Sequence, residues 1–340
     1  MFEPSKILIY KAIIHTLHKE EEEPRCATYE IDHEEELTHH LFTNYLEKIM
    51  TSNQMKWASF EEGSEVEAVL EELLKDPSIF VEVTKDLSKV IQKNLNKYRE
   101  YLPSCDMAFI LFEMEDIMYL GIVKLNHKNI YVRKTEKSPG GELNLIKNSN
   151  DLYIQPKSTV EEGMVIHLPH MDIALIDKEY KVEGEKQSFF ADISFSLNKG
   201  MSEKEKLKSF NQINKRLQEK FIGEDLEQKA QIKKAISDTL VDTGLLDVSM
   251  ALDKAFDESE EIKNIYKEAL GKVNLTNEKI LIDNNAARRK FDVQKITTSS
   301  GIELTIPVEY FNDDSKVEII SNSDGTLTFM IKGIEEFISS

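Results

Sequence analysis

Apolar positions in the first part of the chain repeat with the short period of β-strands in several separate runs. β-Branched and aromatic residues cluster in these runs, as expected for strands that are buried on at least one face. The most apolar pair is MAFILFE and IMYLGIVKL, joined by a polar turn at Met114, Glu115 and Asp116. The strands predicted in this way lie at residues 6–17, 26–31, 107–113, 117–125, 164–169, 172–177 and 188–196.

A longer period, with apolar residues three and four positions apart, predicts three helices between the strands. The first has Leu41, Tyr45 and Ile49 on one face. The second begins at Ser64, where Glu67 completes the pattern of a capping box, and it ends before Pro77. The third carries an apolar stripe over residues 83–102, which Pro103 terminates.

The pattern becomes helical again from Ser202, with further helices predicted at residues 226–241, 249–259 and 260–270. Residues 134–157 are polar and read as a loop or insertion, with a short strand possible at 152–155. Strands at 302–307, 317–320 and 326–331 close the chain, the last two joined by a turn containing Asp324-Gly325. We therefore predict an α+β fold: an α+β domain at 1–197 with an antiparallel sheet, then a helical segment and a small β-hairpin module at 198–340.

Composition adds little to this picture, but it excludes some classes of protein. With 340 residues, 40% hydrophobic residues and 31% charged residues, the chain is typical of a cytoplasmic globular protein of two domains. Cys26 and Cys105 are too far apart in sequence to suggest a disulfide framework or a zinc knuckle. No apolar run approaches the roughly 20 residues that a membrane span needs.

Charge gives the first indication of function. The whole chain carries −19, yet residues 124–137 hold five cations and one anion, a local charge of +4. Localised cations on an acidic protein favour a docking surface for an anion, although an edge strand kept soluble by its charges would look the same. Two groups of residues are the candidate phosphate contacts: Lys124, Lys128, Arg133 and Lys134 in this segment, and Arg288, Arg289, Lys290 and Lys295 before the terminal β module.

Catalytic chemistry has weak support. No phosphate-binding glycine loop, nucleophile elbow or matched cysteine and histidine occurs in the chain. His167, His170 and Asp172 form the one histidine cluster beside an acid, but the Leu-Pro between the histidines argues against a metal site. We therefore expect no catalytic residue, metal or cofactor. Acidic runs at 20–23 and 34–36 fit either a protein-docking surface or solvated helix starts and loops.

The order of these segments resembles that of the 37-kDa nucleoid-associated, or NdpA-like, proteins. The matching segments, in chain order, are 7–17, YREYLP at 98–103, MAFILF at 107–112, 119–124, 168–169, DIALID at 172–177, GIELTIP at 301–307 and 326–333. The resemblance implies a non-enzymatic bacterial protein of the nucleoid, associated with DNA or with proteins that act on it. It brings no catalytic or DNA-contacting residues, so the cations named above rest on charge alone.

Three functions remain open at this point. The chain could bind DNA directly through its basic segments, as a homodimer that strengthens a modest contact. It could instead dock through its acidic surface onto a DNA-topology enzyme or another DNA-handling protein. A metal-dependent nuclease, supported only by the His167 cluster, is the third.

Overall fold

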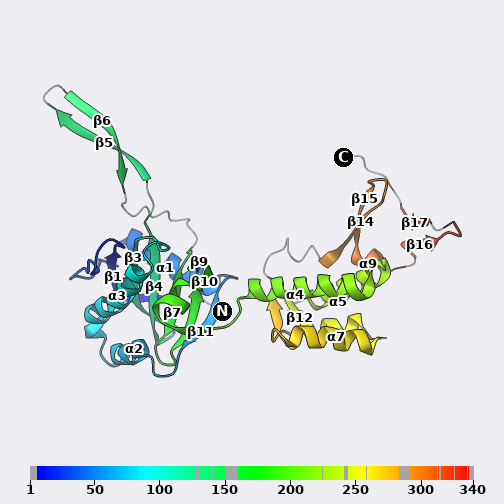
Figure 1. The fold of residues 1–340 in the computed structure, drawn as a ribbon, viewed down its shortest axis with the longest axis horizontal. Helices are drawn as coiled ribbons and strands as arrows, with labels where there is room; N and C mark the ends of the chain where they lie inside the picture. Colours follow the sequence, from blue (N-terminus) through cyan, green and yellow to red (C-terminus); the bar gives the residue numbers. More distant parts are fainter. Residues whose placement is uncertain are drawn as a thin grey trace. The chain divides into compact units, whose positions relative to one another are not determined.

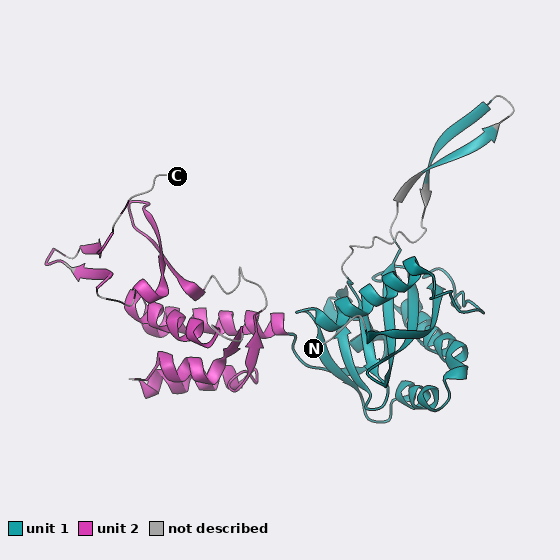
Figure 2. Ribbon diagram, turned by 180° about the vertical axis from the view of Figure 1, so that it is seen from behind, with its two compact units in different colours: residues 1–202 teal, residues 203–340 magenta. Residues whose placement is uncertain are grey.

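The computed structural model describes residues 6–127, 130–138, 141–149, 160–223, 225–240, 244–257, 259–282, 291–311, 313, 315–324, 326–334 and 336 (Figure 1). The chain divides into two compact units, residues 1–202 and 203–340 (Figure 2). The sequence places a boundary at residue 197, whereas strand β11 (Leu197–Lys199) pairs with β2 (Lys56–Phe60) and so belongs to the first unit.

The first unit is built on a seven-stranded antiparallel sheet, which confirms the predicted α+β class. The strands follow the order β1-β3-β4-β7-β8-β2-β11 across the sheet. The bounds of the remaining strands are β1 (Leu8–Leu17), β3 (Cys105–Met114), β4 (Ile117–Asn126), β7 (Gly163–His167) and β8 (Asp172–Ile176). The sequence does not predict β2, because it has only five residues and its one large aromatic residue before Phe60, Trp57, is exposed.

Helices cover both faces of this sheet, and strand β3 shows why the sequence allows it. Its residues are buried without interruption from Cys105 to Phe112, since alternate side chains point to opposite faces. Phe109 and Leu111 pack with the helices α2 (Glu65–Lys75) and α3 (Phe80–Lys97). Ala108 and Ile110 pack on the other face with α1 (Glu36–Thr51).

The helix starts and turns follow local chemistry. The Ser64 hydroxyl accepts a hydrogen bond from the Glu67 amide at 3.4 Å, as a helix cap should. The reciprocal half of the predicted capping box is not formed, because the Ser64 amide donates to the Glu61 carbonyl. Between β3 and β4, Glu115 and Asp116 both have positive φ, the requirement of the tight turn that joins twisted strands.

Close approach of α1 to the sheet depends on one glycine. A Cβ at Gly121 of β4 would lie 2.4 Å from Leu46 Cδ2 of α1, well inside contact distance. The helix can therefore pack directly against the strand only because this position has no side chain.

Three predicted segments of the first unit have a different structure. Residues 26–31, predicted as a strand, are irregular. The segment predicted as a strand at 188–196 instead contains a π-helical turn, Phe189–Ser194. A hairpin of β9 (Glu179–Val182) and β10 (Glu185–Ser188) precedes this turn. The polar stretch from 134 forms a hairpin, β5 (Ile130–Ser138) with β6 (Gly141–Ser149), which pairs with no other described strand. The short strand suggested at 152–155 lies outside the described residues. Finally, α3 ends at Lys97, before Pro103.

Strand β1 lies at one edge of the sheet and has irregular features along its length. The pairing of β1 with β3 shifts between Ile9 and Lys11, which marks a bulge at Tyr10. Along the outer edge, Thr16 and Arg25 exchange two backbone hydrogen bonds, and the Ile31 amide donates to the Ala12 carbonyl. The chain after β1 thus occupies part of the edge of its own sheet.

In the described residues, the second unit combines helices with three short antiparallel strand pairs. Its helices are α4 (Glu203–Leu217), α5 (Leu226–Leu240), α6 (Val248–Ala255), α7 (Glu260–Gly271) and the short α9 (Val308–Phe311). Its strands pair as β12 (Leu245–Asp247) with β13 (Lys279–Leu281), β14 (Val293–Thr297) with β15 (Glu303–Pro307), and β16 (Val317–Ser321) with β17 (Leu327–Ile331).

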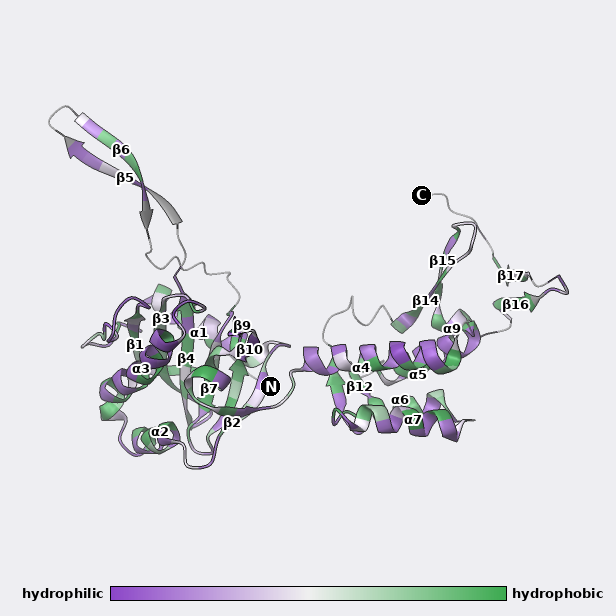
Figure 3. Cartoon of the chain, viewed as in Figure 1, coloured by the Kyte–Doolittle hydropathy of each residue, from purple (hydrophilic) through white to green (hydrophobic). Residues whose placement is uncertain are grey.

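Packing of this unit follows the predicted helical faces. Figure 3 shows hydrophobic and hydrophilic residues mixed along α5 and α7, as expected of helices with one buried side. Ala230 of α5 packs against Ile306, Phe311 and Val317 from the terminal β module. Within the described part of the chain, no helix combines the length and apolar character needed to cross a membrane.

Candidate nucleic-acid interface

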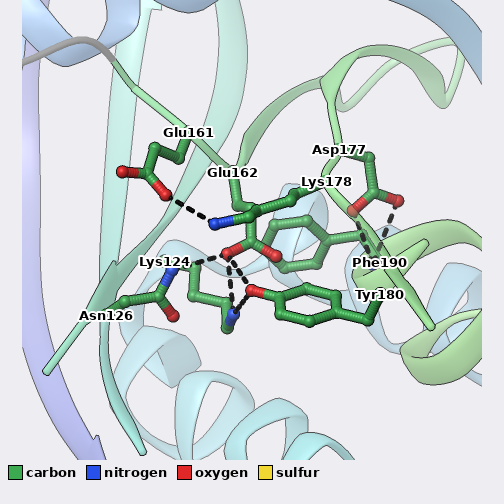
Figure 4. A network of polar contacts seen from close by, with 8 residues as sticks. All are labelled: Lys124, Asn126, Glu161, Glu162, Asp177, Lys178, Tyr180 and Phe190. Atoms are coloured by element: carbon green, nitrogen blue, oxygen red, sulfur yellow. Dashed lines mark hydrogen bonds and ion pairs between the residues drawn. The ribbon is translucent and has the colours of Figure 1, made fainter. Parts of the chain in front are cut away.

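Lys124, the first cation of the basic segment, lies inside the first unit. Its ammonium group contacts the Glu162 carboxylate at 2.7 Å, and both side chains are 0% exposed. Lys124 also donates a hydrogen bond to the Tyr180 hydroxyl at 3.0 Å, and its Nζ lies 4.0 Å from the centre of the Phe189 ring. Figure 4 shows Lys124, Tyr180 and Glu162 converging from β4, the strand β9 and the segment before β7, respectively.

Glu162 is the centre of this network. Its Oε2 accepts hydrogen bonds from Tyr180 and from Asn126, both at 2.8 Å, in addition to the Lys124 contact. Removing two charges from water costs several kcal/mol per ion, and such a pair persists only with several well-formed hydrogen bonds. The predicted phosphate contact by Lys124 is therefore corrected: its ammonium group faces Glu162 in the interior and has no access to a phosphate.

Titratable groups around the network respond to its burial. Burial raises the pKa of Tyr180, and the neighbouring Glu162 charge raises it further. Burial also raises the pKa of Asp177 to about 6, although its carboxylate accepts hydrogen bonds from the Phe190 and Ala191 amides. Those amides belong to the π-helical turn, so Asp177 holds the segment that was predicted to be a strand.

The β5–β6 hairpin carries the remaining described cations of this segment, and it divides them between two faces. Arg133 pairs with Ile146 and Lys134 pairs with Leu145, so the two cations point to opposite sides. On the Lys134 side, Glu136 forms an ion pair with Lys147. Lys128 lies outside the described residues. The local charge of +4 therefore does not form one basic surface.

In the second unit, cations gather where α5 meets β14. Lys295 of β14 is exposed, and the half-buried Lys233 of α5 donates a hydrogen bond to the Val293 carbonyl at 3.2 Å. Burial lowers the pKa of Lys233, and the positive charge of Lys295 lowers it further. Arg288, Arg289 and Lys290 lie outside the described residues.

Two further lysines lie on α5. Lys229 shares the face of Lys233, whereas Lys234 is about 100° around the helix and lines a hollow with Asp238, Asp253 and Asp257. Lys229 precedes Lys233 by one helical turn, and Lys234 is exposed. The pKa of Asp313 is lowered by its hydrogen bonds with Ser315 and then by the charges of Lys316 and Lys234. We call Lys229, Lys233, Lys234 and Lys295 the α5 basic surface. As far as the structure describes the chain, none of the four forms an ion pair with a carboxylate.

Of this surface, only Lys295 was predicted from the sequence. The other three lie on a helix that the periodicity predicts correctly, with Lys229 and Lys233 four residues apart on one face. That spacing is a usable signal. The carboxylates Glu227 and Asp238 on the same helix dilute the local charge, so a count of charges does not single out these lysines.

The histidine cluster adopts a stacked arrangement. The rings of His167 and His170 are parallel with centres 4.8 Å apart, and the His170 amide donates to His167 Nδ1 at 3.1 Å. This hydrogen bond occupies one ring nitrogen of His167. Across the residues given in the structure, no group of three or more histidine, cysteine, aspartate or glutamate side chains is placed to hold a metal ion.

The chain thus consists of an antiparallel α+β unit and a helical unit that carries the α5 basic surface. The family model described as "Nucleoid-associated protein YejK" matches residues 13–338, nearly the whole chain. The chain therefore belongs to this nucleoid-associated protein family, as its sequence predicts, and the family indicates a role at the nucleoid. A search of curated proteins found no match.

Proposed function

We propose that this protein is a non-enzymatic nucleoid-associated protein that binds duplex DNA directly through the α5 basic surface. The supporting observation is that Lys233, which donates to the Val293 carbonyl of β14, is within electrostatic reach of Lys295, so that the two cations repel each other. Among the described residues, neither lysine has a carboxylate partner. A DNA phosphate placed between them would remove this repulsion. Arg288, Arg289 and Lys290 precede β14 in sequence and would add to the same contact.

The charge of the two units supports this assignment. Unit 1 holds 36 acidic and 23 basic residues, a net charge of −13, whereas unit 2 holds 26 and 20, a net charge of −6. Screening over about 8 Å at physiological salt allows a local basic surface to attract phosphate despite negative charge elsewhere. Because the surface is small, two copies acting together as a homodimer would strengthen binding through effective concentration.

The test is a titration of labelled duplex DNA with the full chain, over salt from about 50 to 200 mM. Each phosphate contact contributes about 0.9 to the slope of log affinity against log salt. The triple variant K233A/K234A/K295A should therefore reduce that slope by about 2 to 3 and weaken binding at low salt by at least about tenfold.

A matched control changes the charge equally in the same unit. Lys215, Lys272 and Lys279 are exposed, and each has a carboxylate partner, in Glu219, Glu268 and Asp247 respectively. The variant K215A/K272A/K279A should leave the salt slope almost unchanged. Equal losses in the two variants, or no DNA binding by the wild type at low salt, would contradict the proposal. The second result would favour docking on a DNA-topology or other DNA-handling protein.

A further inference from the structure

The β5–β6 hairpin forms a two-stranded sheet of its own within the first unit. Among the described residues, neither of its strands pairs with a third strand. A hairpin of two strands is at best marginally stable in water, and a further strand is the usual way to stabilise it. Both outer edges of the hairpin therefore present unpaired backbone groups to which another strand could add.

The edge formed by β5 is closed by charge. Four of the five residues from 133 to 137 are charged, and all five are exposed: Arg133, Lys134, Thr135, Glu136 and Lys137. A twofold axis centred on any charged residue would place that residue opposite its own copy. An axis centred on Thr135 would place Arg133 opposite Lys137. Like charges directly opposite each other destabilise a strand pair, so two copies of β5 cannot pair favourably.

The edge formed by β6 is different, because apolar residues occupy its middle. Leu143 is 52% exposed, Ile146 is 78% exposed, and Leu145 is half-buried. Leu143 and Leu145 lie two residues apart, so both point to the same face of the hairpin. If two β6 strands pair antiparallel about a twofold axis at Asn144, Leu143 of each copy lies directly opposite Leu145 of the other. All four leucines then form one cluster.

The flanking charges fit the same arrangement. Within each hairpin, Glu136 lies opposite Leu143 and Lys134 lies opposite Leu145. A row across the four strands would thus run from Glu136 through the two leucines to Lys134 of the partner subunit. Apolar pairs lie at the centre of each row, with one charge of each sign outside them.

No like charges meet across the β6 edge in this register. Glu142 would lie opposite Ile146 of the partner subunit, and Lys147 would lie opposite Gly141 of the partner subunit. The two strands at the axis are therefore complementary in both charge and apolar contact.

We propose that the β6 edge is the dimerisation surface of this protein, and that its occupant is the β6 strand of a second copy of the chain. The pairing is antiparallel about Asn144 and produces a four-stranded sheet. This inference rests on the homodimer of the proposed function and names its surface. Because β5 is closed by charge, each hairpin has one edge that can pair, so assembly ends at two copies.

Cysteine cross-linking tests the register. Directly opposed residues of antiparallel strands have Cβ atoms about 4.5–5.5 Å apart, close to the spacing of a disulfide. In a C26S background, which removes the partly exposed cysteine, N144C should form a covalent dimer on mild oxidation.

The matched control for this variant is T135C in the same background. Thr135 lies opposite Asn144 in the same hairpin, so its two copies would be about 14 Å apart across the four-stranded sheet and should not cross-link. Equal cross-linking of the two variants, or none by N144C, would contradict the proposed pairing.

Sedimentation velocity of the full chain without DNA measures the non-covalent dimer. The wild type should dimerise with a Kd of roughly 1–100 µM, as expected of a small interface. The variant L143K/L145K sets lysines opposite lysines and should weaken the dimer by at least about tenfold. The control Y29K/L37K adds the same charge at two exposed apolar positions of the first unit and should dimerise as the wild type does.

These outcomes separate the dimer surface from DNA binding. A monomeric wild type, or a dimer unaffected by L143K/L145K, would overturn the inference and leave the β6 edge to a strand of another protein. Salt-dependent DNA binding by that monomer would leave the α5 basic surface intact. A dimer that is lost in L143K/L145K, formed by a protein that binds no DNA, would support the dimer surface and contradict the DNA-binding proposal.

Discussion

Two lysines of this protein, Lys124 in the first unit and Lys233 in the second, are removed from water to different degrees and with opposite consequences. Lys124 is fully enclosed and meets a carboxylate, a hydroxyl and an aromatic ring. Lys233 is half-buried and donates to a backbone carbonyl, and the positive charge of Lys295 lowers its pKa. A lysine enclosed together with its carboxylate is confined to the interior, whereas one that has no carboxylate partner and is repelled by a like charge is available to an external anion.

The largest expected effect comes from breaking the interior pair. K124A leaves the Glu162 charge buried and alone, so it should lower the free energy of unfolding of the first unit by about 3–5 kcal/mol. Urea unfolding followed by circular dichroism measures this loss. The double variant K124M/E162M removes both charges at similar volume and should recover most of it.

DNA binding by K124A provides the critical comparison. At a temperature where the variant remains folded, its affinity and salt slope should equal those of the wild type. A stable K124A protein that had lost DNA binding would reverse the comparison, because Lys124 would then act as an external contact.

Next in size is a pair of opposite pH effects within the first unit. His15 is fully buried; its Nδ1 accepts from the Ala27 amide and its Nε2 lies 3.0 Å from the Thr84 hydroxyl. Burial, with a smaller contribution from Lys85, lowers the pKa of His15 to about 4. The folded state thus favours neutral His15, and this stability, present above pH 6.5, is lost as pH falls toward 4.

The contribution of Asp177 to stability changes with pH in the opposite direction, because its pKa is raised to about 6 in the folded state. Its contribution is present below pH 3.8 and is lost as pH rises through 6. As the pH falls from 6.5 to 4, the free energy of unfolding of H15Q should rise by about 3 kcal/mol relative to that of the wild type. As the pH falls from 6 to 4, the free energy of unfolding of D177N should fall by about 3 kcal/mol relative to that of the wild type. Unfolding of the three proteins at several pH values measures both slopes, and parallel slopes would contradict the assignment.

The smallest expected effect concerns the hairpin. Arg133 and Lys134 point to opposite faces of β5–β6, so one DNA backbone cannot engage both from one side. The variant R133A/K134A/K137A should therefore weaken DNA binding by less than about threefold, compared with at least tenfold for K233A/K234A/K295A. Gel shifts of the two variants at the same salt decide between the surfaces. A larger loss from the hairpin variant would move the interface to the first unit.

Local patterns in the sequence predicted much of the fold. The apolar face of α1, including Tyr45 and Ile49, and the continuous burial of β3 and β4 depend on residues near one another in the chain. The same holds for the Ser64 cap. Side-chain period and local capping are properties of a short segment, so they can be read before the tertiary structure is known.

Features that depend on distant partners could not be predicted in this way. Phe189–Ser194 is apolar and β-branched enough to suggest a strand, but Asp177 supplies the backbone hydrogen bonds of a π-helical turn. Likewise, Lys124 looks like the start of a basic surface until Glu162, 38 residues away, places it inside. The residues of the candidate site were the hardest to predict, because the tertiary structure decides which cations are exposed and which are paired.

The bulged edge of β1 also limits how copies of this protein can associate. Sheets commonly join through their edges when a neighbouring chain adds a strand, a route that also leads to aggregation. Here the positions at Ala12 and Thr16 are already taken by Ile31 and Arg25 of the same chain. A strand from a second copy therefore cannot add at these positions of β1, so any pairing of sheets between copies would have to use another edge, such as that of β11 or β6.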